Sequence, residues 1–330
     1  MDAHVLAVGS YTAATGGRGP GIALVDRDPA TGRLGAVGAV ADCPSPSFLA
    51  VGEGGVVHAA HEVDEGFVSS RRPGAGGWEL LGEAPSGGSS PCHLTVLPGF
   101  LVVANYGGGV GVVELAGGAV SQLRQTLRGT GSGPDPDRQE SSHPHSTRRF
   151  GDHLAVLDLG TDEIRVHATT SGGLSAEPLR TVALAPGTGP RHAVTVGDRF
   201  FVAAELDATV TSFAVHGDDL LDPVVASATA VPADRRVYPS EIAVAPWGLV
   251  VANRRAEVVT VHEVVDGIAR PVRDLEIGGV NPRHVAVVGR HLYVSAQDSD
   301  RVVHLALDDD LTVVDRSVAE IGSPACVVPL

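Results

Sequence analysis

A short proline phrase recurs seven times along the chain and limits the fold more than any other sequence feature. Each copy has a polar or glycine residue, then proline, then two polar or small residues, then an apolar run, as in SPSFLAV, GPRHAVTV and NPRHVAV. The prolines are 42 to 53 residues apart and stand at Pro46, Pro91, Pro144, Pro190, Pro239, Pro282 and Pro324. This period matches the ~40–50 residues of a propeller blade. The spacing therefore predicts seven blades in a ring.

A second phrase follows each of the first six prolines after 14 or 15 residues. There an apolar run ends abruptly in polar side chains, as in VVANYG, VAAELD and VVANRR. The next segment usually alternates between apolar and polar residues, as in EVVTVHEV, which is the period of a half-buried strand. No comparable stretch has a helical period. The pattern predicts an all-β chain, and the in-phase phrases favour a propeller over an array of β-sandwiches with coincidental prolines.

The two ends of the chain complement each other. The seventh proline phrase has almost no chain after it, whereas the N-terminus offers the strand-like VLAVGSYT and GIALVDRD with no proline phrase before them. We expect the final SPACVV to form the innermost strand of a blade beside the first strands, which removes sheet edges. Residues 1–330 are then a single seven-bladed β-propeller domain, with one blade closed by N- and C-terminal strands. The longest step contains RGTGSGPDPDRQESS, which predicts a loop over one face.

The net charge of the chain limits the classes of molecule that it can bind. The sequence has 39 acidic against 24 basic residues, a net charge of -15, and its basic residues are all arginine. An acidic surface repels phosphate backbones and anionic lipids, so we expect no nucleic-acid and no membrane partner. The start has no basic n-region, and no run approaches the ~18 apolar residues of a spanning helix. The three cysteines (Cys43, Cys92 and Cys326) are too few to staple a chain of this size with disulfides, which fits a reducing compartment, so we predict a cytoplasmic protein. We also expect a monomer or weak homodimer.

The strand ends marked by the two phrases converge at the mouth of the channel, where propellers bind ligands. All three asparagines and six of the 14 histidines of the chain fall in these phrases. Arg191, Arg254 and Arg283 join these histidines in a locally basic mouth, which favours a small anionic ligand. A structural ring of salt bridges between blades is the alternative interpretation.

The phrases also resemble a known family. SPSFLAV, PCHLTV followed by VVANYGGG, DPDRQESSHPHS, PGTGPRH, YPSEIAV and VVANRR together resemble the seven-bladed lactonase family, the propeller-type 6-phosphogluconolactonases. The resemblance runs from about Val8 to about Val303, and RQESSHPHS and GPRH are its most specific motifs. It implies a lactonase, with 6-phosphogluconolactone as the expected substrate. Because the family includes fungal enzymes that close carboxymuconate to a lactone, a muconate-type lactonizing isomerase is an alternative, and a binding module without turnover is another.

The resemblance implies site residues one motif at a time. SHPH, GPRH, the glutamate after the following strand and the NR pair give the catalytic set His143, Arg191, Glu205 and Arg254. His145 and Arg283 match common family positions with less settled roles. Together with other residues of the ring, they make up the substrate-binding set His93, Asn105, His145, His192, Glu241, Arg283 and His284.

Lactone hydrolysis requires an activated water, a stabilised oxyanion and an acid for the leaving alkoxide. Glu205 and His143 could share the base and acid roles, and the sequence does not say which is the base. Arg191 and Arg254 could bind the oxyanion or a phosphate bidentately. A lone glutamate at a strand end could also be a blade-locking ion pair.

Two other chemistries were weighed. His143 and His145 could chelate a divalent metal with Glu62, Asp158 or Glu205. The proline between the two histidines and the lack of a definite carboxylate partner weigh against this, so we expect neither metal nor cofactor. Cys92 beside His93 suggests a thiolate nucleophile, but a small semi-buried residue is the favoured interpretation.

Overall fold

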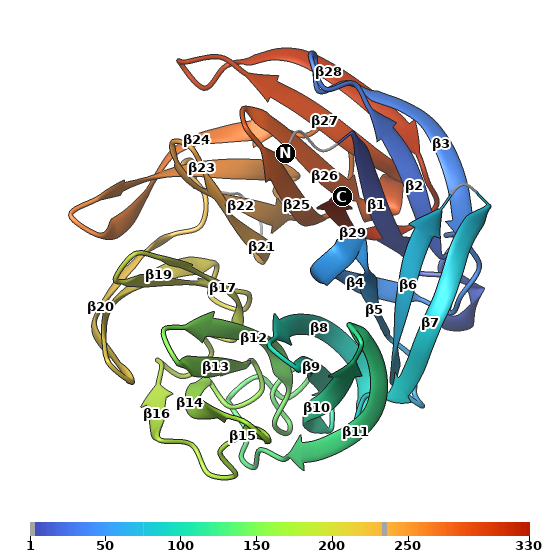
Figure 1. Ribbon diagram of the computed structural model, residues 1–330. Coiled ribbons are helices and arrows are strands. Elements are labelled where there is room, and N and C mark those ends of the chain that lie inside the picture. The colour runs from blue at the N-terminus through green and yellow to red at the C-terminus, as the bar shows by residue number, and fades with distance from the viewer. Residues whose placement is uncertain (1–3, 75, 233–235) are drawn as a thin grey trace.

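The strands form seven sheets arranged in a ring (Figure 1). The structure is a computed structural model that describes residues 4–74, 76–232 and 236–330. Six sheets have four strands and one has five. Within the described ranges, helix is limited to the short 3-10 segments Ala13–Thr15, Glu53–Gly55 and Gln297–Ser299, and no helix is long and apolar enough to span a membrane. The prediction of an all-β, seven-bladed propeller is confirmed.

Each blade is an antiparallel sheet whose strands follow one another from the channel outward. The blade that contains both chain ends comprises β29 (Pro324–Pro329), β1 (Val5–Ser10), β2 (Ile22–Arg27) and β3 (Leu34–Ala41). The next comprises β4 (Pro46–Val51), β5 (Val57–His61), β6 (Phe67–Gly74) and β7 (Gly77–Pro85). Then come β8 (Ser89–Leu97), β9 (Phe100–Gly107), β10 (Gly109–Ala116) and β11 (Ala119–Leu127).

The five-stranded blade comprises β12 (Pro144–Phe150), β13 (His153–Asp158), β14 (Glu163–Thr170), β15 (Gly173–Leu174) and β16 (Arg180–Ala183). It is followed by β17 (Pro190–Val196), β18 (Arg199–Ala204), β19 (Thr209–His216) and β20 (Asp219–Ser227). The last two blades are β21 (Tyr238–Ala245), β22 (Gly248–Arg254), β23 (Val258–Val265) and β24 (Ile268–Glu276), and β25 (Pro282–Val288), β26 (His291–Ala296), β27 (Arg301–Leu307) and β28 (Val313–Glu320).

Every proline phrase begins an innermost strand. These strands are β4, β8, β12, β17, β21, β25 and β29, and each contacts the next around the channel. The residue before the proline has a positive φ in five blades, at Ser45, Ser90, Gly189, Asn281 and Ser323. Glycine and asparagine adopt this left-handed region more readily than bulky or β-branched residues do. The small or polar residue at that position of the phrase therefore allows the backbone to adopt this positive φ.

A β-bulge follows every one of these prolines. In each of the seven blades the register between the innermost strand and its neighbour shifts between the proline and the second residue after it. A bulge leaves one extra residue unpaired and re-aims its side chain. As a result, the two residues after each proline can both face the channel, although strict alternation would send one of them to the other side of the sheet.

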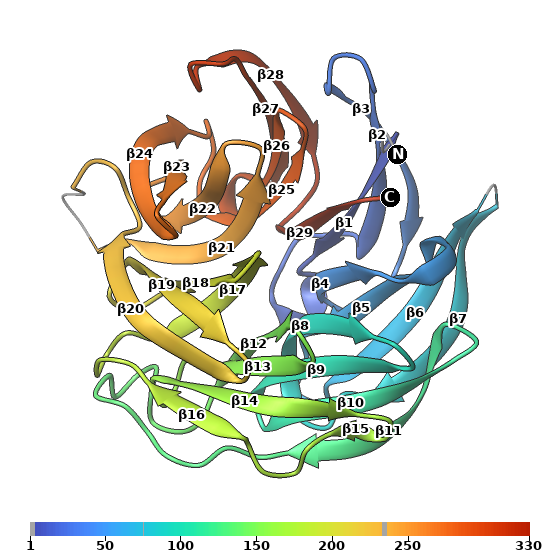
Figure 2. The same cartoon turned by 60° about the vertical axis from the view of Figure 1, so that its left-hand side comes forward.

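The terminal strands close the ring as predicted. β29 pairs with β1, with Leu6 opposite Pro329 and Gly9 opposite Cys326. Figures 1 and 2 both show β29 beside β1 in this blade. Cys326 and Val327 are fully buried, so the closing strand is part of the core.

The core is divided among the interfaces between blades. In the described part of the chain, seven apolar clusters each join residues of two neighbouring blades. The second strands are buried on both faces, as in β5, whose residues are all buried, whereas outer strands such as β20 are largely exposed. This explains why apolar runs such as VVAN precede the polar ends of the second phrase. Packing between blades therefore holds the channel-lining strands in place.

Candidate active site

The pairing of strands brings the two sequence phrases to one end of the channel. In the antiparallel hairpins, Pro91 lies opposite Asn105, and Pro239 lies opposite Asn253. The start of each innermost strand thus meets the end of the second strand. We call this end the proline-side mouth, and the end where the innermost strands finish the opposite mouth.

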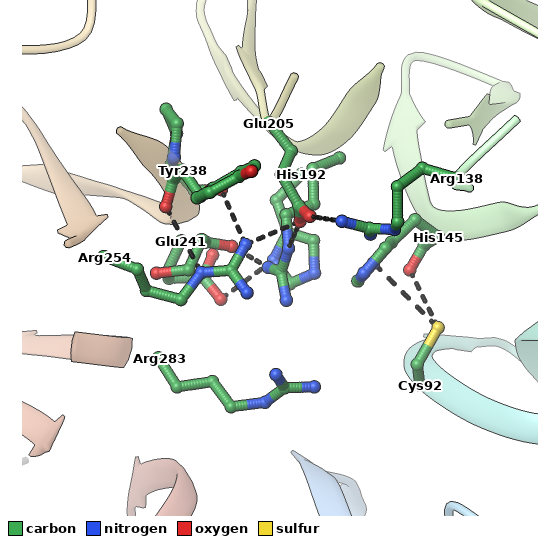
Figure 3. A network of polar contacts seen from close by, with 12 residues as sticks. Cys92, Arg138, His145, His192, Glu205, Tyr238, Glu241, Arg254 and Arg283 are labelled. Atoms are coloured by element: carbon green, nitrogen blue, oxygen red, sulfur yellow. Dashed lines mark hydrogen bonds and ion pairs between the residues drawn. The ribbon is translucent and has the colours of Figure 1, made fainter. Parts of the chain in front are cut away.

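Glu205 is the centre of the charged network at the proline-side mouth. It follows β18, is 1% exposed, and forms three ion pairs: with Arg191 (2.9 Å), Arg254 (2.6 Å) and Arg138 (2.6 Å). Figure 3 shows the guanidinium groups of Arg138 and Arg254 reaching this carboxylate from different directions. Burial alone would raise the pKa of Glu205, but the three arginines together lower it well below its usual range. The carboxylate is therefore held ionised.

Arg191 lies deepest of the three arginines. It is 3% exposed, and besides Glu205 it donates a hydrogen bond to the Ser240 carbonyl in the next blade. Burial, followed by the charge of Arg254, lowers the pKa of Arg191 to about 10. The side chain is still cationic at neutral pH. It joins the β17 and β21 blades directly below the carboxylate.

A cavity of about 630 Å³ opens above this network. Arg254 lies on its wall and donates from Nε to the Tyr238 carbonyl (3.2 Å). The Tyr238 ring also has the guanidinium carbons of Arg255 at 4.6 Å and Arg236 at 5.1 Å from its centroid. The described residues lining the cavity are Asp135, Asp137, Arg138, Glu205, Arg236, Tyr238, Arg254, Arg255, Glu257, Val280, Asn281 and Asp298. A carboxylate and several arginines thus face a space large enough for a small sugar derivative.

A second cavity of about 490 Å³ adjoins the first, and Asp298 lines both. Here Tyr11 donates to Glu62 Oε2 (2.7 Å) and accepts a hydrogen bond from Arg283, whose guanidinium carbon lies 4.9 Å from the Tyr11 ring centroid. Burial raises the pKa of Tyr11, and the Arg283 charge opposes that rise. Arg283 thus belongs to the proline-side mouth but does not contact Glu205.

His143 is separated from Glu205 by two side chains. Its ring stacks on Tyr106 with centroids 4.3 Å apart, and its Nδ1 lies 2.7 Å from the Tyr106 carbonyl oxygen. Its Nε2 lies 2.9 Å from Glu140 Oε1. The Tyr106 hydroxyl in turn accepts from Arg138 Nε (3.2 Å). The predicted acid–base pair is therefore linked through Tyr106 and Arg138 and is not in direct contact.

The opposite mouth holds a second carboxylate. Glu241 Oε2 lies 2.9 Å from His192 Nδ1 and 3.3 Å from His284 Nε2, while Oε1 accepts the Ile242 N–H (3.0 Å). Burial raises the pKa of Glu241, partly opposed by the charges of His284 and Arg191. Burial also lowers the pKa of both histidines. This end therefore combines one carboxylate with neutral imidazoles.

The bulge accounts for the division of the predicted residues. Of the residues one after the proline, Arg191 and Arg283 reach the proline-side mouth, whereas Cys92 and His145 remain inside the wall. Residues two after the proline face the opposite mouth, where His93, His192, Glu241 and His284 line a cavity of about 580 Å³. The sequence placed all of them in a single ring because it shows the phrase and not the bulge.

Three further residues lie inside the wall. His145 is buried between the two mouths, with its ring centroid 5.4 Å from that of His192, and burial lowers its pKa. Cys92 lies beside it, and burial raises the pKa of its thiol, as expected for an unreactive side chain. Asn105 is fully buried and donates to the carbonyls of Ser86 (3.0 Å) and Gly109 (3.2 Å). Its amide supports its own blade and lines neither proline-side cavity.

Sequence reasoning left several side chains of the proline-side mouth unassigned, among them Arg138 and Tyr238. Arg138 forms one of the three ion pairs of Glu205, and the Tyr238 ring contacts the arginines of the cavity wall. Arg138 is the first residue of RQESSHPHS, and Tyr238 directly precedes a phrase proline. Their positions within or next to the motifs were the available signal. Arg138 belongs to the loop of residues 128–143, which contains no strand, as predicted.

His143 and His145 do not share a site, since each has the separate neighbours given above. Across residues 4–74, 76–232 and 236–330, no three histidine, cysteine, aspartate or glutamate side chains are grouped so that they could hold a metal ion.

Comparisons with known proteins agree on one family. The family described as "Lactonase, 7-bladed beta-propeller" matches residues 5–329. A fungal protein from Arthroderma benhamiae, named "Probable 6-phosphogluconolactonase", is 28% identical over 97% of this chain and 89% of its own. A Bacteroides fragilis structure described as a candidate 6-phosphogluconolactonase has 26% identity and a TM-score of 0.89 over 99% of this chain and 98% of its own. The Pseudomonas aeruginosa periplasmic gluconolactonase has 26% identity and a TM-score of 0.87 over 98% of both chains.

Proposed function

Because the chain belongs to the seven-bladed β-propeller lactonase family, we propose that it hydrolyses a sugar lactone at the proline-side mouth. One observation carries this proposal: a buried carboxylate, Glu205, holds three arginines at the floor of a 630 Å³ cavity. The names of the relatives, which refer to lactonases of phosphorylated and unphosphorylated gluconolactone, support a lactone as substrate.

The arginines provide the electrostatic part of the mechanism. When water attacks the lactone carbonyl, negative charge develops on the carbonyl oxygen. Arg138 and Arg254 line the cavity, and each guanidinium has five N–H donors of which Glu205 uses only part. The remaining donors of Arg138 can stabilise the oxyanion, while those of Arg254 can hold the substrate in both the ground and the transition state. Because Glu205 fixes them beforehand, little reorganisation is needed during the reaction.

Glu205 is therefore first a positioning residue. Its lowered pKa makes it a weak base, since proton transfer from water to it is strongly unfavourable. An ionised carboxylate can still accept a hydrogen bond from the attacking water and orient it. In this mechanism Glu205 orients water and arginines together, and catalysis depends more on charge stabilisation than on basicity.

His143 is the proposed acid for the leaving alkoxide. Its two nitrogens face a backbone carbonyl and the Glu140 carboxylate, which both accept hydrogen bonds. The imidazole can therefore donate a proton from either nitrogen, as a general acid must. It lies behind Tyr106 and Arg138, towards the loop of residues 128–143, and does not itself line the 630 Å³ cavity.

The cavity rim supports a phosphorylated substrate, 6-phosphogluconolactone. Arg255 contacts the Tyr238 ring and forms no ion pair with another described residue, so its charge is available to a ligand. Arg236 lies on the same ring and pairs with Asp135 at 3.4 Å. An arginine fork matches the geometry of a phosphate group. The cytoplasmic location stays a prediction.

The deciding experiment times proton release from freshly prepared 6-phosphogluconolactone against its spontaneous hydrolysis. We expect acceleration by the purified protein, and a smaller acceleration with unphosphorylated gluconolactone. Glu263→Gln, which changes an exposed glutamate on β23, is the control for the charge change in Glu205→Gln. Acceleration only of carboxymuconate lactonisation would replace the proposal with the isomerase. No turnover of any of the three substrates would leave a binding module.

A further inference from the structure

The cavity at the opposite mouth is separate from the proposed reaction site. It has a volume of about 580 Å³ and is lined mainly by residues of six innermost strands, β4, β8, β12, β17, β21 and β25. None of Glu205, Arg138 and Arg254 lines it. Its polar groups therefore need an explanation that the hydrolysis of a lactone does not provide.

Two buried imidazoles present unused acceptors there. His192 and His284 each direct one nitrogen at the Glu241 carboxylate, which also accepts the Ile242 N–H. An ionised carboxylate can accept all three bonds, so each neutral imidazole uses its single N–H on Glu241. The other nitrogens, His192 Nε2 and His284 Nδ1, are buried and have no hydrogen-bond partner in the structure. Each therefore carries a lone pair that accepts from a donor such as a hydroxyl group.

An unpaired arginine lies beside these acceptors. Arg148 lines the same cavity, its Nε is buried without a partner, and it forms no ion pair with another described residue. It is close enough for its charge to act on Glu241 and His93. Arg148 is half-buried, and burial lowers its pKa. A partly desolvated cation without a counter-ion favours an anionic ligand.

The rest of the wall is suited to a sugar-like carbon skeleton. The Phe48 ring lies against His93, with centroids 4.3 Å apart, and makes edge contacts with His192 and His284. Thr95, Thr147 and Thr195 also line the cavity. An aromatic face beside hydroxyls and imidazoles is a common way to hold a compound with both C–H and O–H groups.

From these contacts we propose that the opposite-mouth cavity binds a small hydroxylated carboxylate. The ligand's carboxylate pairs with Arg148, and its hydroxyl groups donate to His192 Nε2 and His284 Nδ1. The orientation is fixed because the imidazole lone pairs and the Glu241 charge repel anionic oxygens. A more highly charged ligand such as inorganic phosphate is disfavoured for the same reason. The proposal concerns a second site and does not depend on the activity of the first.

Histidine-ring NMR tests this site by site. Protein labelled at the histidine Cε1 carbons is titrated with gluconate, and the ring signals are assigned with His143→Asn, His192→Gln and His284→Gln. We expect the His192 and His284 signals to shift together in a saturable way, with a dissociation constant in the millimolar range or tighter. His143 reports on the proline-side mouth and separates binding at the two ends.

The matched variants are Arg148→Gln and Arg270→Gln, the latter an exposed arginine on the outer strand β24. Arg148→Gln should weaken the response of His192 and His284 by ~10-fold or more, as expected for loss of a charged hydrogen bond, and Arg270→Gln should leave it intact. A titration with acetate, which has a carboxylate but no hydroxyl groups, tests the role of the hydroxyl groups. Acetate should bind more weakly than gluconate. Equal binding of acetate, stronger binding of inorganic phosphate, or no saturable shift with gluconate would each overturn the proposal.

Discussion

Two buried glutamates at opposite ends of the channel differ in the charges of their neighbours. Glu205 is 1% exposed and lies among three arginines, whereas Glu241 is 8% exposed and lies between two neutral imidazoles. The pKa of Glu205 is lowered and that of Glu241 is raised, although burial pushes both upward. The comparison teaches that the balance of burial and neighbouring charge sets the pKa of a carboxylate in this channel, since three arginines outweigh burial at Glu205 whereas burial outweighs the nearby charges at Glu241.

The difference also separates two kinds of chemistry. The proline-side mouth concentrates fixed cations that can stabilise developing charge. The opposite mouth offers lone pairs and one unpaired cation, which suits selective binding. Variants that change one end of the channel, or the wall between the two ends, test whether this difference holds.

The largest effect is expected from deleting residues 324–330. This removes β29, in which Cys326 and Val327 are fully buried and which pairs with β1. Because the ring would no longer close, both mouths should be lost at once. Loss of ~5 kcal/mol or more from the buried side chains and the exposed strand edge should lower Tm by at least ~5 °C. Thermal unfolding followed by circular dichroism measures this. An unchanged Tm would contradict the role of the closing strand.

Glu205→Gln should reduce the hydrolysis of the lactone substrate by ~10²–10⁴ in kcat, because the arginines lose the charge that positions them. Since buried arginines without a counter-charge are destabilising, a melting curve must accompany the kinetics. Glu205→Asp keeps the charge and should recover part of the rate. Near-full kcat in Glu205→Gln would move the reaction away from this mouth.

The two best-placed arginines should separate in their kinetics. Arg191→Ala should lower kcat by ~10–100-fold, because Arg191 lies directly under the carboxylate and orders the network. Arg254→Ala should chiefly raise KM, by ~10-fold, because Arg254 lies on the cavity wall. Steady-state kinetics on the same lactone distinguishes the two. A reversed order would exchange their proposed roles.

Arg255→Ala tests the phosphate assignment at the rim. We expect kcat/KM for the phosphorylated lactone to fall by ~10-fold while that for the unphosphorylated lactone changes much less, because only the former has a group for this arginine. Arg270→Gln is the control for the loss of a surface charge. Equal losses on both lactones would place the phosphate elsewhere.

The smallest effect is a pair of opposite slopes of stability against pH. The folded pKa of Glu205 lies below the unfolded value of ~4.3, so its contribution to stability is present above that value and is lost as pH falls towards the folded pKa. The folded pKa of Glu241 lies above the unfolded value, so stability falls as pH rises between the two.

Urea unfolding from about pH 2 to about pH 8 checks both slopes, because the window for Glu205 lies below its unfolded pKa and that for Glu241 lies above it. The margin of the wild type over Glu205→Gln should widen as pH rises, and its margin over Glu241→Gln should narrow. Parallel slopes for the two variants would refute the comparison of the two glutamates.

The blade arrangement could be predicted from the sequence because its cause is local and repeated. Each copy of the phrase begins an innermost strand, and the apolar run before each polar end is a second strand buried on both faces. The closing role of SPACVV followed from counting the phrases. These features depend on strand periodicity and on turn residues, which a single sequence displays directly.

The assignment of residues to the two mouths could not be predicted in the same way. Arg191 and His192 are adjacent in the sequence, yet the bulge directs them to different ends of the channel. The partners of Glu205 come from the loop of residues 128–143, from β17 and from β22. Such side-chain contacts depend on irregularities of the backbone and on the packing of one blade against the next. The separation of Glu205 from His143, which the sequence suggested as a shared acid and base, depends on such contacts too, since Arg138 and Tyr106 lie between them.

The bulge repeated in all seven innermost strands bears on how such a protein can diversify. In the blades that begin with β17 and β25, the two residues after the proline, Arg191 with His192 and Arg283 with His284, lie at opposite mouths, and the first residue of each pair is left out of the ladder. Substitutions at these positions can alter specificity at one end of the channel at little cost to folding, because the apolar clusters that stabilise the ring lie elsewhere. The scaffold thus separates the residues under selection for stability from those free to acquire new ligands.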